Sequence, residues 1–385
     1  MFNIIILGLT SLLTDIGSEM VYPLIPLFLV QQLGATPAVV GLIEGVAESL
    51  ASLLKVYFGR VSDQLQRRKS LAIAGYASSA VSKVLIIVAV SWGWVLAGRI
   101  GDRFGKGVRT APRDAIIAES ADPGKKGTSF GLHRALDSAG AVIGVALAYY
   151  LFTSYHGNYR HVFIWSLVPA ILGVLVLALV REAKGAKKAK AKDLSLNWKS
   201  LNPRLKGFLI VVFLFALGNS SNQFLLLRSS DLGMSTAQVI LLYLVFNISY
   251  ALVSFPAGAL SDKIGRRQLL ISGYLIYSAV YLGLARVHNP GHLWLLFIIY
   301  GLYIGITEGV EKALVADVAP QQQRATMLGL HATLTGIGLL PASFLAGLIW
   351  DYFGAAYTFY FGSAMGLLAA LGLAVVLKTE DMKEA

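Results

Sequence analysis

The sequence predicts an all-α membrane protein with twelve transmembrane helices in two pseudo-symmetric bundles of six. Three observations indicate this class. The chain of 385 residues is 56% hydrophobic and only 14% charged, against about 25% charged residues in soluble domains. Charged and turn residues cut it into apolar pieces of about 20 residues, the length that crosses the hydrocarbon core. One long polar run lies near the middle, with six pieces on each side.

The expected helices are the apolar stretches between these breaks. The first contains Asp15 and Glu19 and has no basic region before it, which favours a retained span over a cleaved signal. The twelve predicted helices are residues 4–30, 38–58, 70–90, 93–117, 128–153, 161–180, 206–228, 237–257, 268–287, 292–317, 325–349 and 355–377.

The central polar run separates two predicted domains. Residues 1–180 form an N-terminal six-helix bundle, and residues 206–385 form a C-terminal six-helix bundle. Residues 181–205 are rich in lysine and are interpreted as a cytoplasmic basic linker, solvated near anionic head groups and without a chemical role.

The net charge of +12 is distributed as membrane topology requires. Lys and Arg gather in alternate loops, which by the positive-inside rule places both termini in the cytoplasm of a cell (inner or plasma) membrane. The lipid bilayer, not nucleic acid, is therefore the expected partner of these bases. The chain has no cysteine, and it carries no phosphate-binding loop, hydrolase or metal motif. We therefore do not expect an enzyme, a cofactor or a metal site. We expect the protein to be a monomer.

A loop repeat supports the division into halves. The sequence GRVSDQLQRRK at residues 59–69 recurs as GALSDKIGRRQ at residues 258–268, an offset of 199 residues. A close-packing glycine, a hydrogen-bond-accepting aspartate and paired arginines suit a reversible latch between helices. The predicted latch residues are Gly59, Asp63, Arg67, Arg68, Gly258, Asp262, Arg266 and Arg267.

This duplicated loop on a six-plus-six plan resembles the major facilitator superfamily, with the plan of its bacterial twelve-helix exporters and proton antiporters. The second copy matches the family pattern GxxxDxxGRRx, whereas the first has Gln66 where glycine is usual. The resemblance implies a transporter whose halves rock about a midplane site. It also implies that helices 1, 4, 7 and 10 line the cavity.

The fourth predicted helix has one strongly charged face. Residues 99–114 read RIGDRFGKGVRTAPRD, and their charged side chains fall within an arc of about 140°. A charge at the bilayer centre costs at least about 2.5–3.5 kcal/mol, so this face predicts an aqueous cavity. Three of its bases are the predicted contacts for an anionic part of the substrate: Arg103, Lys106 and Arg109.

The first predicted helix faces this cavity with two carboxylates. Asp15 and Glu19 lie one turn apart, and Tyr22 follows on the same face. Carboxyl groups inside a membrane protein can carry protons near neutral pH. We therefore expect Asp15 and Glu19 to couple protons, and Tyr22 to contact substrate. The alternative is that both carboxylates only pair with the bases of the fourth helix.

The second half differs in its charges. Asn219 and Gln223 give the seventh helix a neutral hydrogen-bonding face, and we expect both to contact substrate. The tenth helix aligns with the fourth at an offset of 202 residues, which places Glu308 and Glu311 at the positions of Lys106 and Arg109. These acids are predicted to bind substrate or to bridge to those bases in one state of the transport cycle.

Together these features predict a proton-coupled secondary active transporter that moves a small organic solute by alternating access, with export preferred. Ionised carboxylates would pair with bases of the fourth helix, and protonation would free those bases for substrate. Two alternatives remain. One is an organic-anion exchanger or uniporter without proton coupling, and the other is a non-transporting membrane receptor or scaffold.

Overall fold

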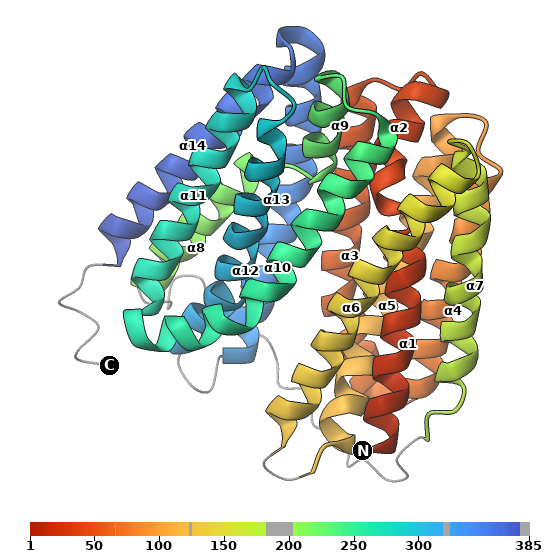
Figure 1. Cartoon of the computed structure of the whole chain (residues 1–385). Coiled ribbons are helices and arrows are strands. Elements are labelled where there is room, and N and C mark those ends of the chain that lie inside the picture. Colours follow the sequence, from red (N-terminus) through yellow and green to blue (C-terminus); the bar gives the residue numbers. More distant parts are fainter. Residues whose placement is uncertain (66, 123–124, 182–202, 319–323, 378–385) are drawn as a thin grey trace. The chain divides into compact units, whose positions relative to one another are not determined.

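The computed structural model describes residues 1–65, 67–122, 125–181, 203–318 and 324–377. Their helical elements are α1 (Phe2–Glu19), η1 (Tyr22–Leu24), α2 (Ile25–Leu27), η2 (Phe28–Gln32), α3 (Pro37–Leu65), α4 (Arg68–Ile87), α5 (Trp92–Ser120), α6 (Lys126–Ser154), α7 (Tyr159–Leu177), α8 (Pro203–Gly218), α9 (Gln223–Asp231), α10 (Thr236–Ile264), α11 (Arg266–Arg286), α12 (His292–Val318), α13 (Arg324–Phe353) and α14 (Ala355–Val376) (Figure 1).

These elements form twelve segments of membrane-spanning length. Ten are long and apolar enough to cross a bilayer, where α1 to η2 make one segment and α8 with α9 makes another. The other two are α3 and α5, each 29 residues long, whose charged side chains lower their mean hydropathy. Over the described residues, the predicted all-helical membrane class is confirmed.

Contacts between helices divide the chain into two units. The N-terminal unit comprises Met1–Ala35, Val46–Lys192 and Ser235–Leu244, and the C-terminal unit comprises Thr36–Gly45, Asp193–Met234 and Val245–Ala385.

The helix pairs of one unit have counterparts in the other. In the N-terminal unit α4 packs on α5 and α7, and α1 packs on α6 and α7. In the C-terminal unit α11 packs on α12 and α14, and α8 packs on α13 and α14 (Figure 1). By position in the chain, α8 and α11–α14 are the repeat equivalents of α1 and α4–α7. The pseudo-symmetry expected from the loop repeat is therefore present in the packing.

The first helix of each repeat is interrupted at the same place. Predicted helix 4–30 is not one regular helix: α1 ends at Glu19, and Pro23 and Pro26 are followed by short helical turns. Proline has no N–H to donate and clashes with the preceding turn. In the second repeat α8 ends at Gly218, 199 residues after Glu19, and α9 begins at Gln223.

Backbone contact sets the distance between α4 and α5. A Cβ atom at Gly75 would lie 2.6 Å from the carbonyl oxygen of Gly105 and 2.7 Å from the Cβ of Arg109. Only a residue without a side chain permits this approach. The charged face of α5 is consequently held close to α4.

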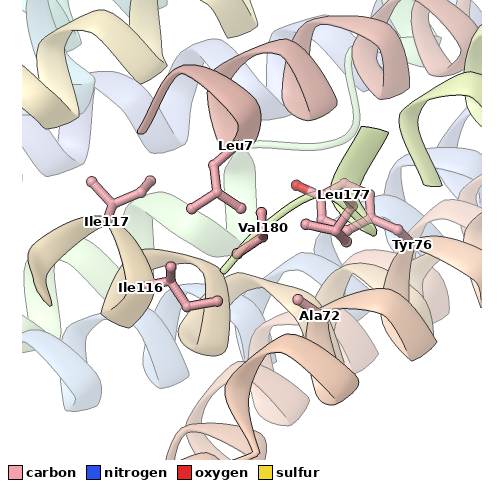
Figure 2. Packing of buried hydrophobic residues seen from close by; sticks show 7 residues of the cluster. All are labelled: Leu7, Ala72, Tyr76, Ile116, Ile117, Leu177 and Val180. Atoms are coloured by element: carbon pink, nitrogen blue, oxygen red, sulfur yellow. The ribbon is translucent and has the colours of Figure 1, made fainter. Parts of the chain in front are cut away.

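A buried apolar cluster lies where α1, α4, α5 and α7 meet (Figure 2). Close packing of such side chains fixes the relative positions of the four helices. Its members are Leu7, Ala72, Tyr76, Ile116, Ile117, Leu177 and Val180.

Candidate substrate and proton site

The N-terminal unit gathers the charged residues of α1, α3 and α5 into one group, which we call the charge cluster. Four of its α5 residues, Arg99, Asp102, Arg103 and Arg109, are buried. Buried charges require nearby opposite charges or hydrogen-bond partners. The cluster comprises Asp15, Glu19, Glu48, Arg99, Asp102, Arg103, Lys106 and Arg109.

The two acidic residues of α1 pack against α6. A Cβ atom at Gly140 would lie 3.1 Å from the Cβ of Asp15, and one at Gly144 would lie 3.1 Å from the Cβ of Glu19. The hydroxyl of Tyr243, on α10, donates a hydrogen bond of 3.0 Å to Oε2 of Glu19. Sequence reasoning missed Tyr243, since it lies in an apolar run without a polar pattern.

Arg103 is the base with the clearest ion pair. Its Nη2 lies 2.9 Å from Oε1 of Glu48 on α3, and its Nη1 lies 3.9 Å from Oδ2 of Asp102. Arg99 approaches the same Asp102 oxygen at 3.8 Å, and its guanidinium lies 5.7 Å from the ring centroid of Tyr22. Of the predicted substrate residues, Arg103 therefore belongs to the charge cluster and Tyr22 lies beside it.

Arg109 is directed towards α4. Its Nη1 donates to Oγ of Ser79, whose hydroxyl in turn donates to the carbonyl of Asp102. The guanidinium also stacks over the ring of Tyr76, 4.5 Å from the centroid, where a cation–π attraction holds it. Arg109 therefore joins α5 to α4 in this structure, and its predicted substrate contact remains a prediction.

Lys106 differs from the arginines beside it. Its side chain is half-buried, and its ammonium forms no hydrogen bond or ion pair with another described residue. It nevertheless interacts electrostatically with Asp15, Glu19 and Glu48. Lys106 is thus influenced by three carboxylates of the charge cluster, but among the described residues its ammonium binds none of them directly.

A fourth helix contributes a buried cation. The ammonium of Lys83 on α4 donates a 2.8 Å hydrogen bond to the carbonyl oxygen of Gly17. Where α1 ends, the N–H of Val21 bonds to the carbonyl of Ser18 instead of continuing the α-helical pattern to Gly17. The interruption of the first helix therefore frees an acceptor, and Lys83 occupies it.

The predicted acids of the C-terminal unit both have tyrosine partners. Tyr250 donates to Oε2 of Glu308 at 2.7 Å, and Lys312 lies 3.5 Å from Oε1 of the same residue. Tyr274 donates to Oε1 of Glu311 at 2.7 Å. The sequence did not indicate these tyrosines, because neither belongs to a polar pattern on its helix.

The neutral residues of the seventh helix lie at its interruption. Asn219 lies between α8 and α9, and Gln223 begins α9. The Gln223 side chain is fully buried, and its amide has no hydrogen-bond partner among the described residues. Its neighbour Asn222 accepts a 2.7 Å hydrogen bond from Tyr300.

Three of the four arginines of the two predicted latch loops have partners within their own unit. Arg68 forms an ion pair with Glu119 at the end of α5. Arg266 donates to the carbonyl of Ala313 at 2.9 Å, and Arg267 donates to that of Ala374 at 3.0 Å. Arg67 is exposed. A Cβ atom at Gly59 would lie 3.5 Å from the Cβ of Ala111. The side chains of Asp63 and Asp262 and the surroundings of Gly258 lie outside the described part of the chain.

These features define a class of protein: a multi-pass membrane protein with two equivalent helical units and a buried charge cluster. A cluster of carboxylates around a cation without a direct partner can exchange protons or bind an anion.

Comparison with known proteins identifies the family. The family model of the Major Facilitator Superfamily matches residues 7–227 and 208–385. An uncharacterized MFS-type transporter of Methanocaldococcus jannaschii is 37% identical over 378 residues, which cover 96% of this chain and 93% of that one. The chain belongs to the Major Facilitator Superfamily of membrane transporters, as its loop repeat indicated.

Two further similarities have narrower scope. Quinolone resistance protein NorA of Staphylococcus aureus is 29% identical over 153 residues, which cover 40% of this chain and 39% of NorA. The crystal structure of a D-xylose-proton symporter superposes with a TM-score of 0.77 at 19% identity, covering 97% of each chain. The second similarity concerns the fold alone.

Proposed function

We propose that this transporter moves a small organic solute with an anionic group, and that protons bound by Asp15 and Glu19 drive it. The environment of Lys106 is the observation that supports this proposal most strongly. Its ammonium lies in the field of three carboxylates without a direct partner among the described residues. An anionic group on a solute can bind such a cation, whereas Arg103 and Arg109 already have partners.

The coupling follows from competition for Lys106. Ionised Asp15 and Glu19 attract the ammonium and repel an incoming anion. Protonation of either carboxyl group removes one negative charge, which weakens that repulsion and makes the net field around Lys106 more favourable to the solute. In this scheme the proton and the anion bind to the same state of the protein, so they cross the membrane together. Tyr22, Asn219 and Gln223 are the proposed neutral contacts of the solute.

The first experiment is a thermal-shift screen of the purified protein against organic anions. A ligand that stabilises the wild type should not stabilise Lys106→Gln, because the neutral amide lacks the positive charge. Lys312→Gln is the matched control, since Lys312 is exposed, lies on α12 rather than α5, and pairs with Glu308 of its own helix. Equal stabilisation of Lys106→Gln and wild type would exclude Lys106 as the anion site.

The second experiment measures flux of that anion in proteoliposomes. A pH gradient should accumulate the anion in the wild type, and Asp15→Asn combined with Glu19→Gln should abolish accumulation. Gradient-driven flux that persists in this double variant would contradict the assignment. Flux that never depends on pH would establish the exchanger or uniporter, and absence of flux with every bound ligand would favour the receptor.

Export in exchange for protons is the second candidate function. The similarity to NorA, whose name describes quinolone resistance, favours it. A pH-sensitive dye inside the proteoliposomes distinguishes the two candidates. Cotransport carries protons in the direction of the solute, whereas exchange carries them in the opposite direction.

The proposed orientation places both termini in the cytoplasm. The natural chain has no cysteine, so single cysteines can be introduced as labelling sites. In intact cells a membrane-impermeant maleimide should label His288→Cys in a predicted outer loop and spare Lys126→Cys in a predicted inner loop. Both positions are exposed. The reverse labelling pattern would overturn the orientation.

A further inference from the structure

The two halves share a histidine motif. Gly-Leu-His occurs at residues 131–133 on α6 and again at residues 329–331 on α13, an offset of 198 residues. Because α6 and α13 are repeat equivalents, His133 and His331 occupy corresponding positions. Both are buried, with exposures of 4% and 5%. In each ring Nε2 has no hydrogen-bond partner among the described residues.

Each histidine lies beside a carboxylate, but the two pairs are built differently. Nδ1 of His133 is 3.5 Å from Oδ2 of Asp137, four residues further along the same helix. Nε2 of His331 is 3.6 Å from Oε2 of Glu311, which belongs to the neighbouring helix α12. Only the pair in the C-terminal unit therefore connects two helices.

The Glu311–His331 pair has a defined hydrogen-bonded setting. The second oxygen of Glu311 accepts the hydroxyl proton of Tyr274 on α11, at 2.7 Å. The imidazole of His331 lies parallel to the ring of Phe208 on α8, with centroids 6.5 Å apart. Tyr274 thus binds one oxygen of Glu311, and Phe208 stacks on the ring of His331. The remaining oxygen of Glu311, Oε2, lies next to Nε2 of His331.

The helices around this pair carry other ionisable groups, which have other partners or lie elsewhere along their helices. On α12, Glu308 is held by Tyr250 and Lys312. On α11, two arginines donate to backbone carbonyls. Two bases stand at the beginning of α8, two exposed tyrosines lie on α14, and Asp351 lies towards the end of α13. The two arginines of α11 are Arg266 and Arg267, the two bases of α8 are Arg204 and Lys206, and the two tyrosines of α14 are Tyr357 and Tyr360.

We infer that Glu311 and His331 form a proton-binding site in the C-terminal unit. A proton from water adds to Nε2 of neutral His331, and the resulting imidazolium pairs with the carboxylate of Glu311. One N–H bond forms, hydroxide remains in the water, and no group is oxidised or reduced. The imidazolium–carboxylate pair is a charge-assisted hydrogen bond between α13 and α12. Its formation therefore joins the two helices, and release of the proton leaves His331 neutral and removes the ion pair.

This site is additional to the carboxylates of α1. Its contribution to transport rests on the proposed proton coupling, but proton binding at His331 does not require a substrate or a gradient. His133 is not assigned the same function, since its carboxylate partner lies on its own helix. Protonation of His133 would leave the packing of α6 on other helices without a new ion pair.

The test is a histidine titration of the full chain in lipid nanodiscs, with no substrate present. The chain has six histidines, so ¹⁵N-histidine NMR gives few resonances, and His331→Gln assigns the relevant one. The ¹⁵N resonance of His331 should shift through a titration midpoint as the pH is lowered. Glu311→Gln should displace its midpoint by about one pH unit or more, because a charge in contact is lost.

Glu308→Gln is the matched control, because Glu308 lies on the same helix and should leave the His331 midpoint unchanged. Glu311→Asp provides a second variant that keeps the charge if the glutamine variant does not fold. A midpoint that is identical in wild type and Glu311→Gln would overturn the proposal, as would the absence of titration. Combining Asp15→Asn with Glu19→Gln should leave this titration intact even where flux is lost, which separates the two proposals.

Discussion

Removal of the Glu48 charge should destabilise the N-terminal unit. Glu48→Gln keeps the shape of the side chain but eliminates the ion pair with Arg103, whose two atoms are 2.9 Å apart. Loss of one partner from a buried ion pair costs about 3–5 kcal/mol. Glu48 is 32% exposed, and Asp102 remains 3.9 Å from Arg103. Both facts lower the expected cost to about 2 kcal/mol.

Thermal unfolding of the detergent-solubilised protein, followed by tryptophan fluorescence, measures this effect. At about 2–4 °C per kcal/mol, the apparent Tm of Glu48→Gln should fall by about 4–8 °C. Lys312→Gln breaks an ion pair whose lysine side chain is 61% exposed, so its Tm should change by less than about 4 °C. If Glu48→Gln melts at the wild-type temperature, the ion pair does not stabilise the unit and the reasoning fails.

Two further substitutions test contacts of the same unit. Tyr243→Phe removes the hydrogen bond to Glu19, which is worth roughly 1.5–3 kcal/mol for a charged acceptor. The pH profile of gradient-driven flux should therefore shift, and an unchanged profile would disconnect Tyr243 from coupling. Gly75→Ala places a Cβ 2.6 Å from the Gly105 carbonyl and should cost about 1–3 kcal/mol in thermal unfolding. Gly131→Ala meets open space on α6 and should cost nothing, so equal losses would contradict the packing argument.

The sequence was sufficient to predict the class and the repeat, because both depend on patterns that survive in one dimension. Apolar runs between charged breaks locate spans, and the loop motif recurs at a constant offset. The interruption after Gly218 was not predicted. Its residues are polar but include no proline, so nothing local required α8 to end there.

Partners of the charged side chains were harder to predict. Helical periodicity places Lys106 and Arg109 on the same face of α5, but it does not determine where a long side chain points. Arg109 turns to Ser79 and Tyr76, whereas Lys106 stays near the carboxylates of α1. Such choices depend on neighbouring helices. The tyrosine bound to Glu19 was invisible for the same reason, since Tyr243 is distant in sequence and lies in an apolar segment.

The central claim is that protons on Asp15 and Glu19 and an anion at Lys106 bind cooperatively. Calorimetric titration with the anion from the thermal-shift screen, repeated in buffers of different ionisation enthalpy, measures protons exchanged on binding. Near the pH where these carboxyl groups titrate, the wild type should take up about one proton per anion bound. The Asp15→Asn, Glu19→Gln double variant should take up none. The same proton uptake in both proteins would contradict the claim.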